Sequence, residues 1–457
     1  MTGTRRAMKE GWMIDRREFN RRLVAAAAGI ASGTARMRFA GAAPDYSINP
    51  GRLRGNLEAL AQIGRTPEGG VSRVAWTAAD VAGRQWVVDK LLKPMGLEMR
   101  IDPAGSIFGR RPGRNSGLPP ILFGSHIDTV TNGGRFDGAL GSLAGIEALQ
   151  TISERKIETN RPLECVIWSN EEGEHYGRGL FGSRALVGYF EPGEMDSKDD
   201  RGQHIRDAVR GVGGDPARLE EARKKPGDYA AYLELHIEQG GVLDKAGIEI
   251  GVVEGIVGIV RYQVQIAGSA NHAGTTPMPE RHDALVAAAE LVLAVREETV
   301  REPGRQVGTV GKLSVDPGVT NVIPGKVSLT IEQRDLSLEK VEAIFKRISA
   351  RAQEIDRKWG TRTEITQTSV HQPALSTPWV RETIAREAVA AGLSVLQMPS
   401  GAGHDAQMMA RLAPMGMIFV PSVGGISHAP KELTRWDDAA NGCEVLYRSV
   451  IAIDREA

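Results

Sequence analysis

The chain has 457 residues, of which 41% are hydrophobic and 25% charged, a composition typical of an ordinary folded protein. Its 57 Lys/Arg balance its 57 Asp/Glu, but residues 1–42 hold nine basic and three acidic residues, so the remainder carries a net charge of −6. A mildly acidic body argues against nucleic acid as a partner. The length exceeds what one simple core needs, and we expect two domains.

The basic start of the chain has the pattern of an export signal. Arg16 and Arg17 precede Phe19, a modest Ala-rich apolar run begins at Leu23, and small residues occupy 40–42. The run is too short and too rich in alanine to span a bilayer stably, so we expect no membrane span. We interpret residues 1–42 as a twin-arginine signal, which predicts a periplasmic protein. A basic amphipathic tail, or a start codon assigned too early, is the alternative and would leave the protein in the cytoplasm.

Alternating helix and strand patterns follow this segment. Apolar spacing predicts helices and strands in the order helix 52–63, strand 121–123, helix 140–153, strand 163–168 and strand 230–234. Strands separated by helices indicate a mostly parallel sheet covered on both faces, with ligands at the carboxyl ends of its strands. The charged, Gly/Pro-rich stretch 197–228 is expected to be an exposed excursion.

Residues 255–369 have a different pattern. They predict, in order, strand 259–266, helix 284–298, strands 307–315 and 326–334, helix 338–355 and strand 361–368. This β-α-β-β-α-β order is the ferredoxin-like arrangement. The expected fold class is therefore α/β: a mostly parallel-sheet catalytic domain, residues 45–254 and 370–457, into which a lid or dimerisation domain, residues 255–369, is inserted.

Five short segments carry side chains that divalent metals prefer. They contain His126 with Asp128, Asp137, the pair Glu171–Glu172, His236 with Gln239, and His428. Imidazole and carboxylate suit Zn, Mn, Co or Ni, and the absence of Cys from the set argues against a structural zinc site. We expect two divalent ions per subunit, with zinc the first candidate and Mn, Co or Ni the alternatives. The remaining histidines His175, His204, His282 and His371 are interpreted as structural.

The spacing of these residues indicates their roles. Asp137 lies eleven residues after His126 in a Gly-rich loop, and a carboxylate can bridge two metals where imidazole cannot; a plain Asx turn is the alternative. Asp128 is expected to orient a ligating imidazole rather than to bind metal. Adjacent side chains at a strand end diverge, so one of Glu171 and Glu172 can bind a metal while the other acts as general base toward the attacking water.

These motifs, in this order and from about residue 50 onward, resemble the hydantoinase/carbamoylase branch of the M20 metallopeptidase family. That branch includes N-carbamoyl-L-amino-acid hydrolases and allantoate amidohydrolases. The peptidase branch has a much longer gap before the bridging Asp and uses a carboxylate where His236 stands. The resemblance implies the roles of the metal-site residues: His126 and His236 hold one metal, Glu172 and His428 hold the other, Asp137 bridges, and Glu171 is the base.

The resemblance also implies a set of substrate-binding residues: Gln239, His272, Asn321, Arg334, Gly403 and His404. Arg334 offers a planar fork for a substrate carboxylate, with a surface salt bridge as the alternative. His272 and Asn321 can donate to the carbonyl oxygen as it gains charge. In relatives these lid groups come from the partner subunit, which implies a homodimer.

We therefore expect a hydrolase that cleaves the linear C–N amide bond of a small N-carbamoyl-L-amino acid or related ureido acid. The water is activated by the metals, and Glu171 removes its proton. An allantoate or ureidoglycolate amidohydrolase is the alternative within the same chemistry. An aminoacylase or peptidase, or an exported binding protein without catalysis, fits the motifs less well.

Overall fold

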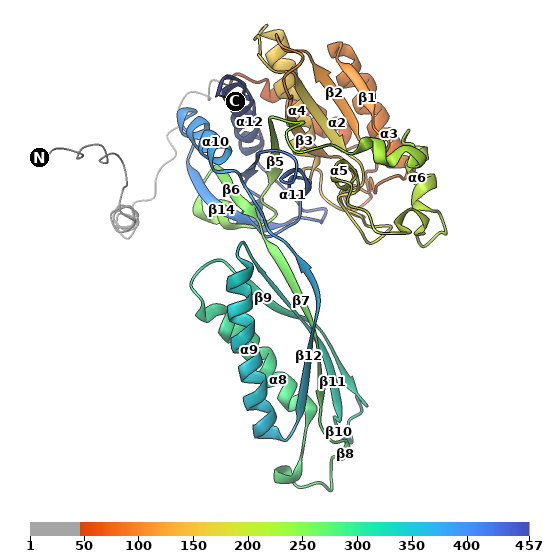
Figure 1. The fold of residues 1–457 in the computed structure, drawn as a ribbon, viewed down its shortest axis with the longest axis vertical. Helices are drawn as coiled ribbons and strands as arrows, with labels where there is room; N and C mark the ends of the chain where they lie inside the picture. Colours follow the sequence, from red (N-terminus) through yellow and green to blue (C-terminus); the bar gives the residue numbers. More distant parts are fainter. Residues whose placement is uncertain (1–45, 457) are drawn as a thin grey trace, which may run out of the picture. The chain divides into compact units, whose positions relative to one another are not determined.

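The structure, a computed structural model, describes residues 46–456 (Figure 1). The predicted export signal, residues 1–42, lies outside the described residues. Within residues 46–456, no helix is long and apolar enough to cross a membrane.

A nine-stranded sheet forms the centre of the first domain. Its middle strands run parallel in the spatial order β4 (Leu163–Trp168), β3 (Ile121–His126), β5 (Ala231–Ile237) and β15 (Met415–Val420). On one side the sheet continues with the antiparallel strands β2 (Ile107–Arg111) and β1 (Glu98–Ile101). On the other side lie β6 (Ile250–Ile256), β13 (Ala374–Leu375) and β14 (Val395–Ser400). The predicted α/β class with a mostly parallel central sheet is confirmed.

Helices cover both faces of this sheet because its strands alternate apolar residues between them. In β3, for example, Ile121 and Phe123 belong to one buried cluster and Leu122 to the other. The first face packs against α2 (Pro50–Leu60), α3 (Ala78–Val87), α4 (Ala139–Glu154), α10 (Pro378–Ala390) and α12 (Trp436–Glu456). The second packs against α5 (Phe181–Val187), α7 (Val242–Ala246) and α11 (Ala406–Met409).

We call the inserted domain, residues 255–369, the lid. It contains a separate antiparallel sheet and two long helices (Figure 1). Its strands follow the order β12 (Arg362–His371), β7 (Gly258–Ala267), β11 (Lys326–Asp335) and β9 (Val307–Asp316), and its helices are α8 (Ala284–Arg301) and α9 (Leu338–Trp359). α9 begins where the Ser337 side chain accepts the N–H of Lys340 and ends at Gly360, whose φ of 64° suits glycine. Two short strands, β8 (Asn271–His272) and β10 (Val322–Ile323), pair beyond this sheet. The predicted β-α-β-β-α-β order is thus present.

Residues 197–228 differ from the expected exposed excursion. They contain α6 (Ile205–Gly211) and the short helix η4 (Pro216–Ala222). The apolar side of α6 is buried in a small cluster that also includes Phe181. The charged residues around α6 therefore obscured the amphipathic pattern of this short helix in the sequence. The remaining single turns are η1 (Val88–Leu92), η2 (Lys93–Met95), η3 (Glu194–Asp196), η5 (Met278–Glu280) and η6 (Val423–Gly425).

Candidate active site

The parallel middle of the sheet brings the candidate metal ligands to one edge. His126 is the last residue of β3, and the Glu171–Glu172 pair follows β4. His236 lies at the end of β5, and His428 lies in the loop after β15. Since the carboxyl ends of parallel strands meet at one edge, residues far apart in sequence become neighbours there.

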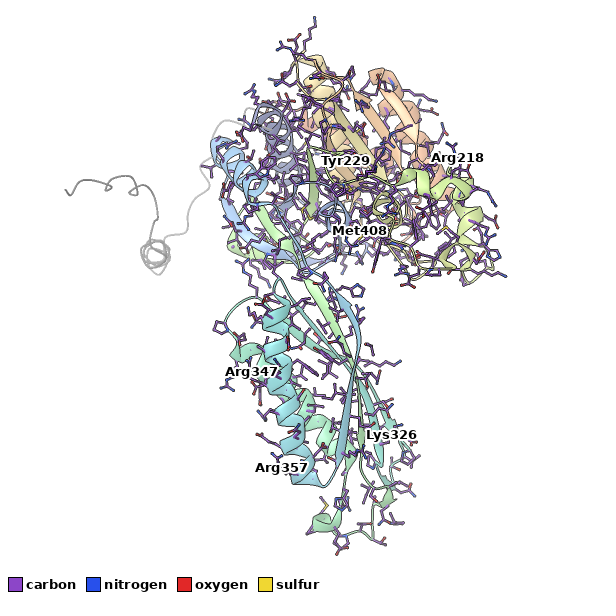
Figure 2. All side chains as sticks on the ribbon, in the orientation of Figure 1. Arg218, Tyr229, Lys326, Arg347, Arg357 and Met408 are labelled. Atoms are coloured by element: carbon purple, nitrogen blue, oxygen red, sulfur yellow. The ribbon has the colours of Figure 1, made fainter. Side chains whose placement is uncertain are left out.

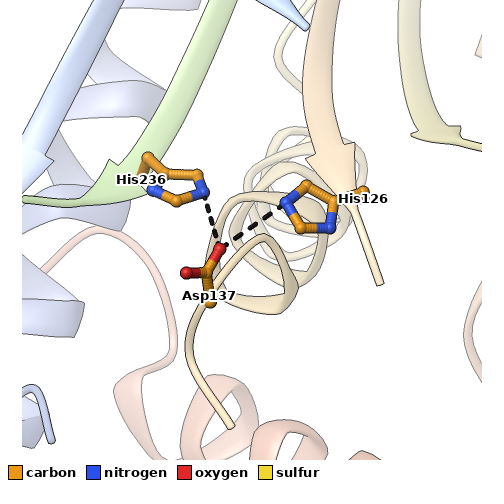
Figure 3. A group of neighbouring side chains, drawn as sticks. All are labelled: His126, Asp137 and His236. Atoms are coloured by element: carbon orange, nitrogen blue, oxygen red, sulfur yellow. Dashed lines mark ion pairs between the residues drawn. The ribbon is translucent and has the colours of Figure 1, made fainter. Parts of the chain in front are cut away.

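Asp137 lies between His126 and His236 (Figure 3). Its Oδ1 is 3.2 Å from His236 Nε2 and 3.6 Å from His126 Nε2. Its Oδ2 faces the other way, 3.3 Å from His428 Nε2. One carboxylate thus presents its two oxygens to two different sets of imidazoles, which is the arrangement that a ligand bridging two cations requires. The neighbouring residue must be glycine, because a Cβ at Gly138, where φ is 60°, would overlap the ring of His126.

The backbone turns both buried imidazoles toward Asp137. His126 Nδ1 is 2.9 Å from the carbonyl oxygen of Asp128, and His236 Nδ1 is 2.9 Å from that of Ile237. Each contact fixes which ring nitrogen carries the proton and leaves Nε2 directed at the site. The Asp128 carboxylate has another function, since it accepts the N–H groups of Glu171 and Glu172 at 3.3 and 3.1 Å. Asp128 therefore joins the His126 loop to the glutamate pair.

The glutamate pair extends the site on both sides. Glu172 Oε2 is 3.6 Å from His428 Nε2, and Glu171 Oε2 is 3.6 Å from His126 Nε2. Three overlapping triads hold their ligand atoms within 4.8 Å of one another: His126–Asp137–His236, His126–Glu171–Glu172 and Asp137–Glu172–His428. Glu172 Oε1 and Gln239 Oε1 are buried without a hydrogen-bond partner among the described residues. Unpaired buried oxygens within a set of imidazoles and carboxylates fit two divalent cations.

The charges at the site favour cation binding. Burial, followed by the charge of Glu172, raises the pKa of Glu171 well above its usual value. Burial, followed by Asp137, does the same for Glu172. Burial alone would lower the pKa of His236, but the charge and hydrogen bond of Asp137, together with the charge of Glu234, raise that pKa to about 9. The carboxylates of Asp137, Glu171 and Glu172 are crowded and have shifted pKa values. Such shifts mark a functional site, and divalent ions bound there would compensate the negative charge.

These residues line a cavity of about 230 Å³, together with Leu180, Gln239, Ala402, Gly403 and His404. Gln239 Nε2 donates to Asp137 Oδ2 at 2.8 Å. The buried ring of His404 lies against the ring of His236, with 4.4 Å between centroids, and its Nε2 is 2.9 Å from Ser400 Oγ. Three of the predicted substrate-binding residues therefore reach the cavity.

The three predicted lid residues do not line this cavity, and they fall into two places. His272 pairs with Val322 in the β8–β10 ladder, and the N–H of Ala273 donates to the Asn321 carbonyl, so His272 and Asn321 are neighbours. Arg334 lies near the other end of β11, eight residues from Lys326 (labelled in Figure 2), a separation of about 26 Å along the strand. Substrate contact by all three residues stays a prediction.

Arg334 has specific partners in this structure. Its Nε and Nη2 donate to Glu332 Oε1 at 2.8 and 2.7 Å, and its Nη1 donates to the Gly401 carbonyl at 2.7 Å. Gly401 directly precedes Ala402 and Gly403 of the cavity wall. In this structure the guanidinium therefore forms a salt bridge with Glu332, and its contact with a substrate carboxylate stays a prediction.

Sequence reasoning missed two buried glutamates. Glu432 accepts the N–H groups of Phe136 and Asp137 at 2.9 and 3.1 Å. Glu234 lies two residues before His236 on β5 and accepts from Ser125 Oγ at 2.7 Å. A signal for Glu234 existed, because an acidic residue interrupts an otherwise apolar buried strand. Glu432 follows a lysine in a polar loop and carried no such signal.

The fold and the site together define a class of protein. A mostly parallel α/β sheet and the loops at one of its edges bring three imidazoles and three carboxylates together around a small cavity. One carboxylate faces two ligand groups, and a spare glutamate stands beside them. This is the site of a metal-dependent hydrolase.

Comparison with known proteins gives the family. Residues 122–452 match peptidase family M20/M25/M40. An N-carbamoyl-L-amino acid amidohydrolase of Geobacillus stearothermophilus is 41% identical over 399 residues, which cover 87% of this chain and 97% of that protein. An allantoate amidohydrolase of Bacillus subtilis is 36% identical over 379 residues, 83% of this chain and 91% of that protein. The crystal structure of a hydantoinase/carbamoylase family amidase from Burkholderia multivorans is 34% identical, with a TM-score of 0.84 over 90% of this chain and 99% of that one. This chain belongs to the M20/M25/M40 family and to its hydantoinase/carbamoylase branch.

Proposed function

We propose that this protein hydrolyses the linear C–N amide bond of an N-carbamoyl-L-amino acid or a closely related ureido acid. The observation that carries the proposal is the position of Asp137 between two ligand groups, with Glu171 beside them. The Geobacillus relative, aligned over nearly the whole of both chains, supports the carbamoyl substrate. The carbamoyl group leaves as carbon dioxide and ammonia, and an L-amino acid remains.

The protein's own residues have distinct tasks in this reaction. Two divalent ions, when bound, polarise the substrate carbonyl and acidify water. His126, Asp137 and His236 would hold one ion, and Asp137, Glu172 and His428 the other. Glu171 Oε2 takes the proton from the attacking water and returns it to the leaving nitrogen. Zinc is our first candidate and Mn, Co or Ni the alternatives, because imidazole and carboxylate oxygen suit all four.

We place recognition of the substrate's carboxylate on Arg334, and contact with its carbonyl on His272 and Asn321. A guanidinium fork matches a carboxylate in two parallel hydrogen bonds. Since His272 and Asn321 lie far along the lid strands from Arg334, a second copy of the chain is needed for them to meet one substrate. That requirement supports a homodimer.

An apolar stripe on α8 further supports the homodimer. Val286, Leu293 and Val300 follow one another at seven-residue spacing, with 37%, 59% and 68% of their surface exposed. Residues so spaced share one helix face. Strand β9 is also the outer edge of the lid sheet, with one side of its backbone unpaired in the sheet. Exposed apolar stripes and free strand edges are the features that a partner covers.

A turnover screen tests the substrate. The purified protein, loaded with Zn, Mn, Co or Ni, is offered N-carbamoyl-L-amino acids, allantoate and ureidoglycolate, with N-acetyl amino acids and dipeptides as controls. We expect ammonia release from the carbamoyl amino acids. Preference for allantoate or ureidoglycolate would establish the alternative, which the Bacillus relative favours. Cleavage of the acetyl amino acids or dipeptides alone would refute the proposal.

We also propose that residues 1–42 direct export by the twin-arginine route. The paired Arg16 and Arg17 before Phe19 and an Ala-rich run support this. Fractionation of a bacterial host should find the protein in the periplasm. Replacement of both arginines by lysine should retain the protein in the cytoplasm, and an unchanged distribution would contradict the proposal.

A further inference from the structure

Glu432 is a buried carboxylate to which the mechanism above assigns no task. Its side chain belongs to a residue that is 3% exposed, and no arginine or lysine forms an ion pair with it among the described residues. A buried carboxylate without a cation is costly unless hydrogen bonds compensate it. The groups that donate hydrogen bonds to Glu432 therefore indicate the role of this carboxylate.

All three donors belong to the metal-site loops. The N–H groups of Phe136 and Asp137 donate to Glu432 Oε1 at 2.9 and 3.1 Å. Ser427 Oγ lies 3.0 Å from Glu432 Oε2 and 2.9 Å from Asp137 Oδ2. Glu432 thus contacts the backbone that orients the Asp137 side chain, and it also contacts Ser427, which directly precedes His428.

The Gly-rich loop is shaped for this contact. A Cβ at Gly134 would overlap the Glu432 carboxylate itself. Only glycine therefore allows Glu432 to approach the loop that carries Asp137. This explains a glycine that the metal ligands alone do not require.

His428 needs such an anchor more than the other ligands do. It is exposed, with 48% of its side-chain surface accessible, and its φ of 54° is unfavourable for a residue other than glycine. The strands hold His126 and His236, but His428 lies in a loop. A bond network from the adjacent Ser427 to Glu432 compensates for the missing strand.

We propose that Glu432 is a positioning residue of the metal centre, which joins the Asp137 loop to the His428 loop so that both present their ligand atoms to the same site. The inference rests on the metal centre of the proposed function but not on its substrate. Groups that orient ligands from behind contribute about 10- to 100-fold in metal affinity.

Three variants and one control test this role. Glu432→Ala removes the acceptor, Gly134→Ala displaces it, and Glu432→Gln keeps an oxygen for the two N–H groups and an amide for Ser427. The control is Glu444→Ala, because Glu444 is also 3% exposed and accepts two backbone N–H groups, those of Ser47 and Ile48, away from the metal site. Its loss should cost comparable stability without touching a ligand.

The measurements are metal content by mass spectrometry, affinity for Zn²⁺ and Mn²⁺ by chelator competition, and unfolding of each metal-free variant. We expect Glu432→Ala and Gly134→Ala to bind metal about 10- to 100-fold more weakly, and Glu432→Gln to stay within about tenfold of wild type. Glu444→Ala should keep wild-type affinity at a similar loss of stability. Wild-type metal affinity in Glu432→Ala, equal losses in Glu444→Ala, or a Gln variant as weak as the Ala variant would each overturn the proposal. Because the readout is metal affinity, a wild-type protein that binds metal but cleaves no ureido acid would refute the proposed substrate and leave this test intact.

Discussion

Metal binding by this protein should strengthen steeply with pH, because two candidate ligands carry protons in the metal-free state. Burial opposes the proton on His236, but the charge and hydrogen bond of Asp137, together with the charge of Glu234, raise the pKa to about 9. The hydrogen bond to Asp137 raises the pKa of His428 to about 9 as well. An imidazole must lose its proton before it can bind a metal through that nitrogen.

The magnitude follows from these pKa values. The pKa of His236 is about two units above pH 7. At pH 7 the need to displace its proton therefore weakens the apparent metal affinity by about 100-fold, or about 2.7 kcal/mol. His428 is half exposed, so solvent reduces its contribution. Between about pH 6.5 and about pH 9, each displaced proton should add about tenfold in affinity per pH unit.

The same protons act in the opposite direction on the metal-free fold. Both pKa values are raised above the unfolded-state value of about 6.5. Their contribution to stability is therefore fully present below about pH 6.5 and is lost as the pH rises through about 9. The metal-free protein should thus weaken over the pH range in which metal binding strengthens.

Chelator competition for Zn²⁺ across this range measures the slope, and calorimetry in buffers of different ionisation enthalpy counts the protons released. His236→Asn should lower that count by about one, while His204→Ala, at a histidine outside the cluster, should leave it unchanged. An affinity that does not depend on pH, or that falls as pH rises, would refute the reasoning.

The remaining predictions concern catalysis, recognition, assembly and stability. Glu171→Gln should keep two metals but lower turnover by about 10²- to 10⁴-fold, and wild-type turnover would show that Glu171 is not the base. Arg334→Lys should raise KM for a carboxylate substrate about tenfold or more and leave its amide analogue unaffected; equal changes for both would contradict carboxylate binding. Leu293→Asp should convert a dimer to monomers in light scattering, because it charges the centre of the α8 stripe; an unchanged mass would exclude this face. Arg73→Met should destabilise the fold by about 3 kcal/mol in denaturant unfolding, because Arg73 is 1% exposed and donates to three backbone carbonyls. Arg65→Met, whose guanidinium bonds only a glutamine side chain among the described residues, is its control and should change little.

The metal-site residues could be predicted because two independent signals coincide. His126 and His236 end apolar runs long enough to be buried strands, and parallel strands deliver their carboxyl ends to one edge. A histidine or an acidic residue that follows such a run is placed at the edge of a buried sheet, which indicates a functional position more than a solvent-exposed one. Asp137 lacked a strand but stood in a Gly-rich loop at a specific spacing from His126.

The residues that sequence reasoning missed act through contacts that no local pattern records. Glu432 meets Phe136 and Asp137 across almost three hundred residues, and its own neighbours look like an ordinary surface loop. The salt-bridge partner of Arg334 lies much closer in the sequence. Glu332 is two residues earlier on the same strand, and residues at that spacing share one face. A Glu-x-Arg sequence in a strand thus predicts an ion pair between the two side chains on one face of the strand. It does not predict which of the two residues a substrate would displace.

The division between the two domains has a consequence for how the reaction is controlled. Every candidate metal ligand belongs to the first domain, two of them, His126 and His236, at strand ends, and no lid residue lines their cavity. The metals and Glu171 can therefore be assembled without the lid. Two lid residues contact the segment that leads into the cavity wall: the N–H of Val257 donates to the Ser400 carbonyl, and Arg334 donates to the Gly401 carbonyl, next to Ala402 of the wall. A substrate carboxylate that bound Arg334 would compete with Glu332 and Gly401 for the same donors. Discrimination between substrates would then follow from how well each one replaces these two partners, while the cleavage chemistry stays the same for all of them.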